Sequence, residues 1–266
     1  MLEIKRLSIK FEKNQILEDI NIKFPNHKIT CLIGKNGTGK STILKSILGF
    51  IRTDTANIYL DNKPLSAYKR KEIAKKIAFL SQNKDIIADI DVKTLVEYGR
   101  YPFLKLFSKL SETDNLIVKE AMELTGIIHL EKRLVNTLSG GEAQRVWLAM
   151  CITQKPEILI LDEPTTFLDV AYQLEILEII KLLNERFGTT IIMVLHDINM
   201  VSRYSDYVYI LDENKITCSG LVKDTITHDN LKKHFDVTGE LIEGHFDDKP
   251  YFIVDKSIIE NKKKIL

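Results

Sequence analysis

The feature that most restricts the fold of this chain is the glycine-rich run GKNGTGKS at residues 34–41, which fits the pattern G-x4-G-K-[ST]. It follows the apolar segment 29–33 and precedes a segment of helical character that begins at Thr42. Glycines allow successive backbone N–H groups to point inward, and a helix N-terminus adds partial positive charge. The run therefore predicts a phosphate-binding loop between a buried strand and a helix, with an ordinary flexible loop as the alternative.

This loop predicts a set of contacts to a nucleoside triphosphate. We expect Lys40 to contact the β- and γ-phosphates and the Ser41 hydroxyl to ligate magnesium. The expected nucleotide-binding residues of the loop are Gly34, Asn36, Gly37, Gly39, Lys40, Ser41 and Thr42. ATP and Mg²⁺ are accordingly the expected cofactors.

Two acids follow a second apolar run, in the sequence ILILDEP at residues 158–164. Carboxylates at the C-terminal edge of a parallel sheet face the ligand crevice. We expect Asp162 to hold magnesium through water, and Glu163 to orient or deprotonate the attacking water. The alternative is a pair of solvated acids before a turn made by Pro164.

The pattern along the rest of the chain predicts an α/β fold. Continuous apolar runs at 29–33, 158–161 and 191–195 are typical of central parallel strands covered on both faces. Residues 2–24 alternate in the strand period and predict an antiparallel hairpin, with 58–65 as a further strand and turn of the same layer. Residues 83–155 have helical periodicity and predict a helical insertion. The charged segment after 235 predicts a solvated tail.

Composition excludes several classes of protein. The 38 Lys and Arg against 37 Asp and Glu give a net charge of +1, which excludes a globally basic nucleic-acid binder. The apolar runs are far shorter than a membrane span, and the start lacks a signal-peptide core, so we expect a cytosolic chain. Three dispersed cysteines predict buried, inert thiols. Three histidines and two aspartates near the C-terminus are irregularly spaced in a charged segment, so we expect them to lie on a solvated surface rather than in a metal site. They are His228, His234, His245, Asp247 and Asp248.

The segment LSGGEAQR at residues 138–145 offers a second set of amide donors at a second helix N-terminus. A helix-capping box of Ser139 with Glu142 is an alternative interpretation and is compatible with that role. Together with the two preceding motifs, this segment resembles the signature of the ATP-binding-cassette (ABC) family. The resemblance covers residues 2–235 approximately.

The resemblance implies that two cassettes pack head to tail around ATP. Ser139 and Gly141 would then touch the γ-phosphate of the ATP held by the phosphate loop of the other copy. Gln82 is similar to the family's switch glutamine, which senses magnesium and links the helical insertion to the core. Asp169 is similar to the loop acid that crosses the dimer interface. His196 is similar to the switch histidine on the γ-phosphate, with a satisfied structural imidazole as its alternative.

Two aromatic residues depart from the family pattern. Phe11 stands where the family often has a tyrosine that stacks on adenine, and core packing is the alternative for its ring. Phe167 replaces the small residue common in the interface loop. The resemblance further implies a P-loop NTPase core at 1–82 and 156–235 with an N-terminal antiparallel β layer, a helical subdomain at 83–155, and an extension of unknown role at 236–266.

Further segments, 98–103, 165–174 and 196–199 followed by 203–206, resemble the subfamily that serves bacterial importers of ferric siderophores, haem and cobalamin. This implies a homodimer on the cytoplasmic face of the membrane, a separate permease and an extracytoplasmic substrate-binding protein. Alternatives are a cassette for haem, cobalamin, zinc or manganese import, an exporter cassette, and a DNA-repair or translation ATPase. We expect no nucleic-acid partner, because the insertion is too short for a long coiled coil.

Overall fold

The structure is a computed structural model, and it describes residues 1–258 except 13, 52–56, 83–88, 106–107 and 245–247. The chain forms two compact units, one of residues 1–65 and 192–266 and one of residues 66–191. Strand β8 (Thr190–Val194) and the short 3-10 helix η1 (Leu65–Ala67) run across the boundaries between them.

The first unit contains most of the strands. Its elements, in chain order, are β1 (Leu2–Phe11), β2 (Asn14–Phe24), β3 (Ile29–Ile33), α1 (Lys40–Ile47), β4 (Asn57–Leu60), β5 (Lys63–Pro64), α7 (Ile198–Tyr204), β9 (Tyr207–Asp212), β10 (Lys215–Leu221), α8 (Val222–Thr225), α9 (His228–Phe235), β11 (Val237–Glu243) and β12 (Pro250–Ser257). The second unit is mainly helical. Its elements are α2 (Arg70–Lys76), β6 (Ile77–Leu80), α3 (Val92–Glu97), η2 (Tyr98–Phe103), α4 (Glu112–Leu124), η3 (Ile128–Leu130), η4 (Val135–Thr137), α5 (Gly140–Thr153), β7 (Ile158–Leu161) and α6 (Val170–Phe187).

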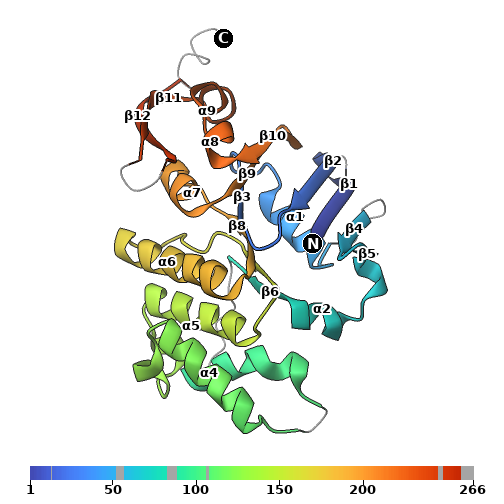
Figure 1. Ribbon diagram of the computed structural model, residues 1–266, viewed down its shortest axis with the longest axis vertical. Coiled ribbons are helices and arrows are strands. Elements are labelled where there is room, and N and C mark those ends of the chain that lie inside the picture. Colours follow the sequence, from blue (N-terminus) through green and yellow to red (C-terminus); the bar gives the residue numbers. More distant parts are fainter. Residues whose placement is uncertain (13, 52–56, 83–88, 106–107, 245–247, 259–266) are drawn as a thin grey trace. The chain divides into compact units, whose positions relative to one another are not determined.

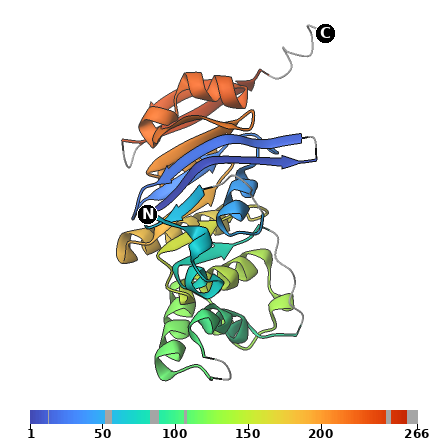
Figure 2. The same cartoon turned by 90° about the vertical axis from the view of Figure 1, so that its right-hand side faces the viewer.

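The predicted N-terminal hairpin is confirmed. Strands β1 and β2 run antiparallel from the pair Leu2–Phe24 to the pair Phe11–Asn14, and form a long ribbon (Figure 2). Strand β4 pairs antiparallel with the other edge of β1, and β5 completes a sheet in the order β2-β1-β4-β5. The alternate apolar residues of β1 are buried, which is the reason for the period-two pattern.

The predicted buried strands are also confirmed. In the first unit β3 lies parallel to β9, which pairs antiparallel with β10. In the second unit β6 lies parallel to β7. Every residue of β3, β7 and β8 is buried, as continuous apolar runs require when both faces of a strand are covered.

The helical segment is built around its own apolar core. Helices α3, α4 and α5 pack together, and α4 and α5 lie side by side (Figure 1). Buried Val96, Met122 and Val146 belong to one cluster that these three helices share. Arg100 is 7 % exposed and donates to Asp114 and to the Thr153 carbonyl, both at 2.8 Å. This arginine therefore joins η2 to the start of α4 and the end of α5.

The prediction of a solvated tail after residue 235 is wrong for 237–257. Strands β11 and β12 form an antiparallel hairpin, and Phe252 is only 3 % exposed. The Asn199 side chain of α7 donates to the Phe252 carbonyl at 3.1 Å and accepts from its amide at 2.8 Å. The sequence pattern did not predict this hairpin, because much of its surface is exposed and charged residues interrupt its short apolar stretches.

The expected solvated histidine surface is wrong for His234, which is 2 % exposed and lies 2.9 Å from an Asp212 carboxylate oxygen; His245 and Asp247 lie outside the described residues. Among the described residues, no group of His, Cys, Asp and Glu could hold a metal ion. Nor does any described helix have the length and apolarity to cross a membrane.

The cysteines follow the prediction with one exception. Cys31 and Cys151 are buried free thiols, and burial raises the pKa of Cys31 to about 12, which keeps it protonated. Cys218 is also free but only half-buried.

We predict that Phe252→Ala lowers the free energy of unfolding by about 3–5 kcal/mol, because it removes a buried ring. Tyr251, on the same strand and 49 % exposed, is the matched control, and its alanine variant should change stability by less than about 0.5 kcal/mol. Denaturant unfolding measures both. Equal, small effects would show that the hairpin contributes no packed core.

Candidate functional site

The predicted phosphate loop joins β3 to α1 in the first unit. Gly39 is the N-cap of α1 with φ 99°, a backbone angle that strongly favours glycine. Lys40 begins the helix and is 5 % exposed. Its ammonium group donates to the carbonyls of Gly34 and Lys35, both at 2.8 Å. The loop thus curls around the Lys40 side chain at the N-terminus of a helix, the arrangement that favours an anion.

The rest of the loop lies near the surface. Asn36 and Gly37 are exposed, and Ser41 and Thr42 in the first turn of α1 are half-buried. The Thr38 hydroxyl donates to the Lys35 carbonyl at 2.9 Å, which closes the loop on itself. The hydroxyl and amide groups of this loop are therefore gathered where β3 ends.

The two acids after β7 lie in different environments in the second unit. Asp162 is 2 % exposed, and its amide donates to the Leu80 carbonyl at the end of β6. Glu163 is half-buried and has φ 52°, a strained backbone angle for a residue with a side chain. The alternative of two solvated acids is therefore wrong for Asp162.

Two side chains hold the Glu163 carboxylate. Gln82 donates from Nε2 to Glu163 Oε2 at 2.6 Å, and the Thr166 hydroxyl donates to the same oxygen at 2.9 Å. Gln82 follows the end of β6 and is exposed. The predicted glutamine and the predicted carboxylate are thus in direct contact, although 81 residues separate them.

The segment 138–145 begins helix α5 through a capping box, as the alternative interpretation proposed. Ser139 Oγ accepts from the Glu142 amide at 3.3 Å, and Glu142 Oε2 accepts from the Ser139 amide at 2.8 Å. The Ser139 hydroxyl also donates to Glu142 Oε2 at 2.9 Å. The bonds that the Ser139 amide and hydroxyl donate to this carboxylate hold the pKa of Glu142 below its ordinary value, against the opposing effect of burial.

Gly141 is buried against helix α6. A Cβ atom on Gly141 would lie 2.6–2.9 Å from three ring atoms of Tyr172, whereas a Cβ on Gly140 would meet nothing within 4 Å. In the same helix, the Gln144 side chain donates to the Pro164 carbonyl at 2.5 Å. Helix α5 therefore fixes the turn that carries Glu163.

These groups surround a shared hollow of about 340 Å³ in the second unit. Gln82 and Glu163 line it together with Gly140 and Gln144 from the start of α5. Phe167 also lines it, although this ring is 96 % exposed and lies on a backbone with φ 64°. The structure thus brings the glutamine, the carboxylate and the signature segment into one concave region.

Three other predicted residues are exposed. Phe11 ends β1 and is 51 % exposed, so the core-packing alternative for it is wrong. His196 is exposed just after β8. Asp169 is exposed and caps α6 by accepting from the Tyr172 amide at 3.1 Å.

Three further residues at these clusters were not predicted from the sequence. Thr166 and Gln144 hold the Glu163 turn, and Asp236 forms an ion pair with Lys35 of the phosphate loop. Thr166 had a local signal, because a hydroxyl three residues after an acid can reach back to it. The contacts of Gln144 and Asp236 bridge 20 and 201 residues of sequence, so no local pattern reveals them.

The predicted magnesium ligands offer only oxygen donors. Ser41 supplies a hydroxyl, Asp162 a carboxylate and Gln82 an amide oxygen. Mg²⁺ prefers such hard oxygen ligands and usually keeps several waters, with one or two carboxylates and phosphates of the substrate. The chemistry of this donor set, with its buried carboxylate, fits the metal.

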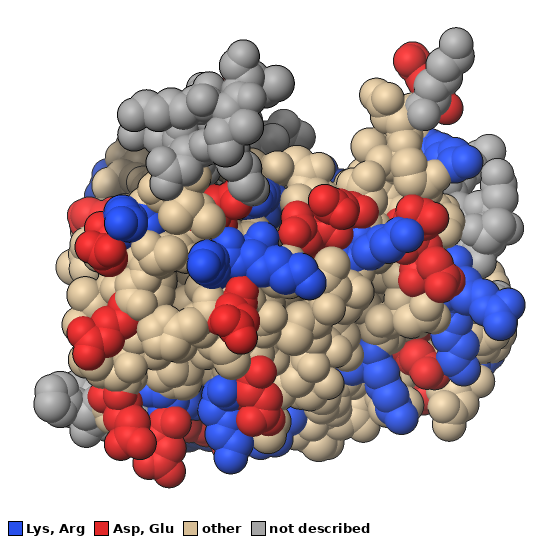
Figure 3. Space-filling model, turned by 90° about the horizontal axis from the view of Figure 1, so that it is seen from above, with Lys and Arg blue, Asp and Glu red and all other residues tan. Residues whose placement is uncertain are grey.

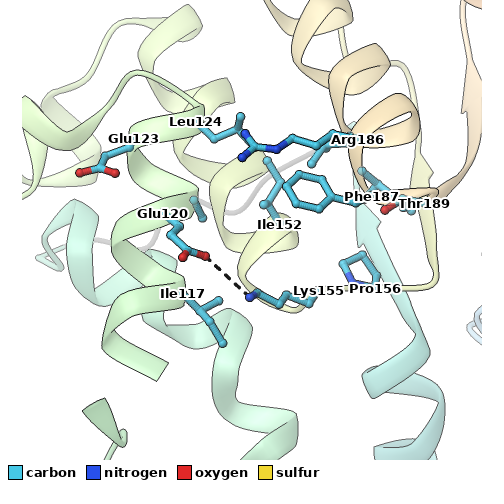
Figure 4. A pocket seen from close by; sticks show the side chains of 13 residues that line it. Ile117, Glu120, Glu123, Leu124, Ile152, Lys155, Pro156, Arg186, Phe187 and Thr189 are labelled. Carbon is cyan, nitrogen blue, oxygen red and sulfur yellow. Dashed lines mark ion pairs between the residues drawn. The ribbon is translucent and has the colours of Figure 1, made fainter. Parts of the chain in front are cut away.

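A second and larger pocket, of about 590 Å³, lies between α4, the end of α5 and the end of α6 (Figure 4). Ile152 and Phe187 line it, and Lys155 forms an ion pair with Glu120 at 3.7 Å beside it. None of the predicted site residues is among the side chains that line this pocket.

One face of the molecule carries charged side chains of both signs. On the face shown in Figure 3, acidic and basic side chains are interspersed rather than gathered by sign.

Comparisons with known proteins agree with these features. The family model described as "ABC transporter" matches residues 17–166. The Iron(3+)-hydroxamate import ATP-binding protein FhuC of Bacillus subtilis is 40 % identical, over 100 % of this chain and 98 % of that protein. The Petrobactin import ATP-binding protein FpuC of Bacillus anthracis is 37 % identical, over 95 % and 92 % of the two chains. The solved dimeric structure of MJ0796, a bacterial ABC transporter cassette, has a TM-score of 0.72 at 25 % identity, over 83 % of this chain and 98 % of that chain.

The fold is therefore the α/β fold of a P-loop cassette ATPase. The chain belongs to the ABC transporter family, and it is an ATPase.

We predict that Gly141→Ala lowers the free energy of unfolding by about 1–3 kcal/mol, because the new methyl group must displace the Tyr172 ring. Gly140→Ala is the matched control, one residue earlier in open space, and should leave stability equal or slightly higher. Chemical unfolding of both variants tests this. Equal stability of the two would contradict the close packing of α5 on α6.

Proposed function

We propose that this chain is the ATP-hydrolysing subunit of a bacterial ABC importer for ferric siderophores. The observation that carries the ATPase mechanism is the Glu163 carboxylate, held by Gln82 and Thr166 directly after a buried strand. The support for the cargo is the similarity, over nearly the whole chain, to import proteins named for iron(3+)-hydroxamate and petrobactin.

The phosphate loop provides the binding part of this mechanism. Lys40 leaves the carbonyls of Gly34 and Lys35 and donates instead to the β- and γ-phosphates, while the loop amides surround them. The Phe11 ring, exposed at the end of β1, stacks on the adenine. Ser41, Gln82 and, through water, Asp162 would hold Mg²⁺, and the bound ion would neutralise phosphate charge.

The carboxylate turn provides the chemical part. Glu163 accepts a proton from, or orients, the water that attacks the γ-phosphate, and Gln82 and Thr166 fix its direction. His196 donates a hydrogen bond to the γ-phosphate. Because Gln82 contacts Glu163, a movement of the residues after β6 changes the position of the carboxylate.

Two copies of the chain act together in this proposal. Ser139 and Gly141, at the N-terminus of α5, meet the γ-phosphate held by the phosphate loop of the second copy, and Asp169 crosses the interface. ATP then stabilises only the closed dimer, and its hydrolysis removes that stabilisation. The homodimer associates with a separate permease at the cytoplasmic face of the membrane, and an extracytoplasmic binding protein delivers the chelate to the permease.

We predict that Glu163→Gln lowers the turnover of ATP by the purified protein at least about a hundredfold, because an amide cannot accept the proton. Binding of a non-hydrolysable ATP analogue should stay within about twofold of wild type, since the amide keeps the size of the side chain. Glu157→Gln is the matched control, because Glu157 pairs at the surface with Lys76. Hydrolysis by Glu163→Gln at the control rate would contradict the role of the carboxylate.

We predict that cells carrying Glu163→Gln in place of the wild-type chain lose uptake of radioactive iron from particular ferric chelates. Uptake of each compound in a panel of hydroxamate and catecholate chelates, haem and cobalamin identifies the cargo. Cells carrying Glu157→Gln at equal abundance are the control. Loss of haem or cobalamin uptake alone would favour another importer of the subfamily. Unchanged uptake of every compound would contradict an importer of these substrates.

A further inference from the structure

The residue that follows α9 contacts the phosphate loop from outside the glycine-rich motif. Asp236 Oδ2 lies 2.5 Å from Nζ of Lys35, the second residue of the loop. The Asp236 side chain is 10 % exposed and that of Lys35 is 41 % exposed. The contact is thus a charge-assisted hydrogen bond with one end buried, a stronger class of interaction than a fully exposed ion pair.

Lys35 also supports the loop from within. Its carbonyl oxygen accepts hydrogen bonds from Lys40 Nζ at 2.8 Å and from the Thr38 hydroxyl at 2.9 Å. A shift of the Lys35 backbone therefore moves an acceptor that positions Lys40. Through Lys35, the Asp236 carboxylate is connected to the residue expected on the β- and γ-phosphates.

Asp236 is itself held in place. It has φ 56°, and its carbonyl accepts from the Ile258 amide at 2.8 Å, just beyond the end of β12. Two residues before it, buried His234 lies with Nδ1 2.9 Å from Asp212 Oδ2. The segment is thus fixed on both sides of the carboxylate.

Asp212 continues this chain of contacts back to the loop. Asp212 is the last residue of β9, the parallel neighbour of β3. The residue before it, Leu211, packs against the start of the phosphate loop. A Cβ atom on Gly34 would lie only 2.1 Å from the Leu211 carbonyl oxygen. The start of the phosphate loop is therefore in close contact with β9, while the side chain of its second residue is tied to Asp236.

We propose that Asp236 is a positioning residue that holds Lys35, and with it the phosphate loop, in the geometry that receives a nucleoside triphosphate. This gives the C-terminal segment from α9 to β12 a role in supporting the loop, in addition to its own packing. The inference rests on the proposed nucleotide contacts of the loop, and it concerns the affinity for nucleotide rather than the chemical step.

A double-mutant cycle on the full chain tests the proposal, with the affinity for a non-hydrolysable ATP analogue as the readout. Asp236→Asn removes the charge and keeps a residue type that tolerates φ 56°. Lys35→Met removes the cation. We expect each to weaken binding about three- to tenfold, and the double variant to bind no more weakly than either single variant. Lys35→Arg, which keeps the cation, should retain wild-type affinity.

Glu18→Gln is the matched control, because Glu18 pairs with Lys215 at 3.2 Å in the same unit and both side chains are more than half exposed. It should leave affinity unchanged. Wild-type or tighter binding by Asp236→Asn, or additive losses in the double variant, would overturn the proposal. If Asp236→Asn unfolds, Lys35→Met still tests the ion pair, because Lys35 has a partly exposed side chain and its replacement should not unfold the protein. Wild-type affinity of Lys35→Met would then overturn the proposal. A wild-type protein that binds no nucleotide would instead contradict the proposed function.

Discussion

The grouping of backbone amides where a helix begins is the constraint on which the proposed nucleotide site depends, since several N–H groups presented together can bind a phosphate. The chain has such a place at the start of α1, after the glycine-rich loop. It has another at the start of α5, where Ser139 and Glu142 cap the helix. Both places carry glycines where bulk is excluded, as Gly141 against Tyr172 illustrates. The glycines of the two motifs are thus explained by backbone geometry and packing.

The second constraint is the orientation of one carboxylate. Glu163 has a strained φ of 52°, and strain of this kind persists only where the surroundings impose it. Gln82 and Thr166 bind its carboxylate, and Gln144 binds the carbonyl of the next residue, Pro164. One neighbouring hydroxyl and two glutamines from distant parts of the sequence therefore determine the direction of this side chain, as its proposed acid–base role requires.

The sequence was sufficient for the elements and motifs that a local pattern encodes. Alternation predicted the β1–β2 hairpin, continuous apolar runs predicted β3 and β7, and helical periodicity predicted α4 and α5. The sequence was insufficient where contacts between residues distant along the chain determine the structure. The β11–β12 hairpin has a mostly exposed surface, so its charged residues suggested a tail. Likewise, burial of His234 and the pairing of Asp236 with Lys35 depend on neighbours far along the chain.

We propose that ATP joins two copies of this chain, each supplying a phosphate loop to one nucleotide and the start of α5 to the other. The most direct test is light scattering on the purified Glu163→Gln protein, in which ATP persists, with Mg²⁺ and either ATP or ADP. We expect twice the monomer mass with ATP and the monomer mass with ADP. The same mass with both nucleotides would contradict it.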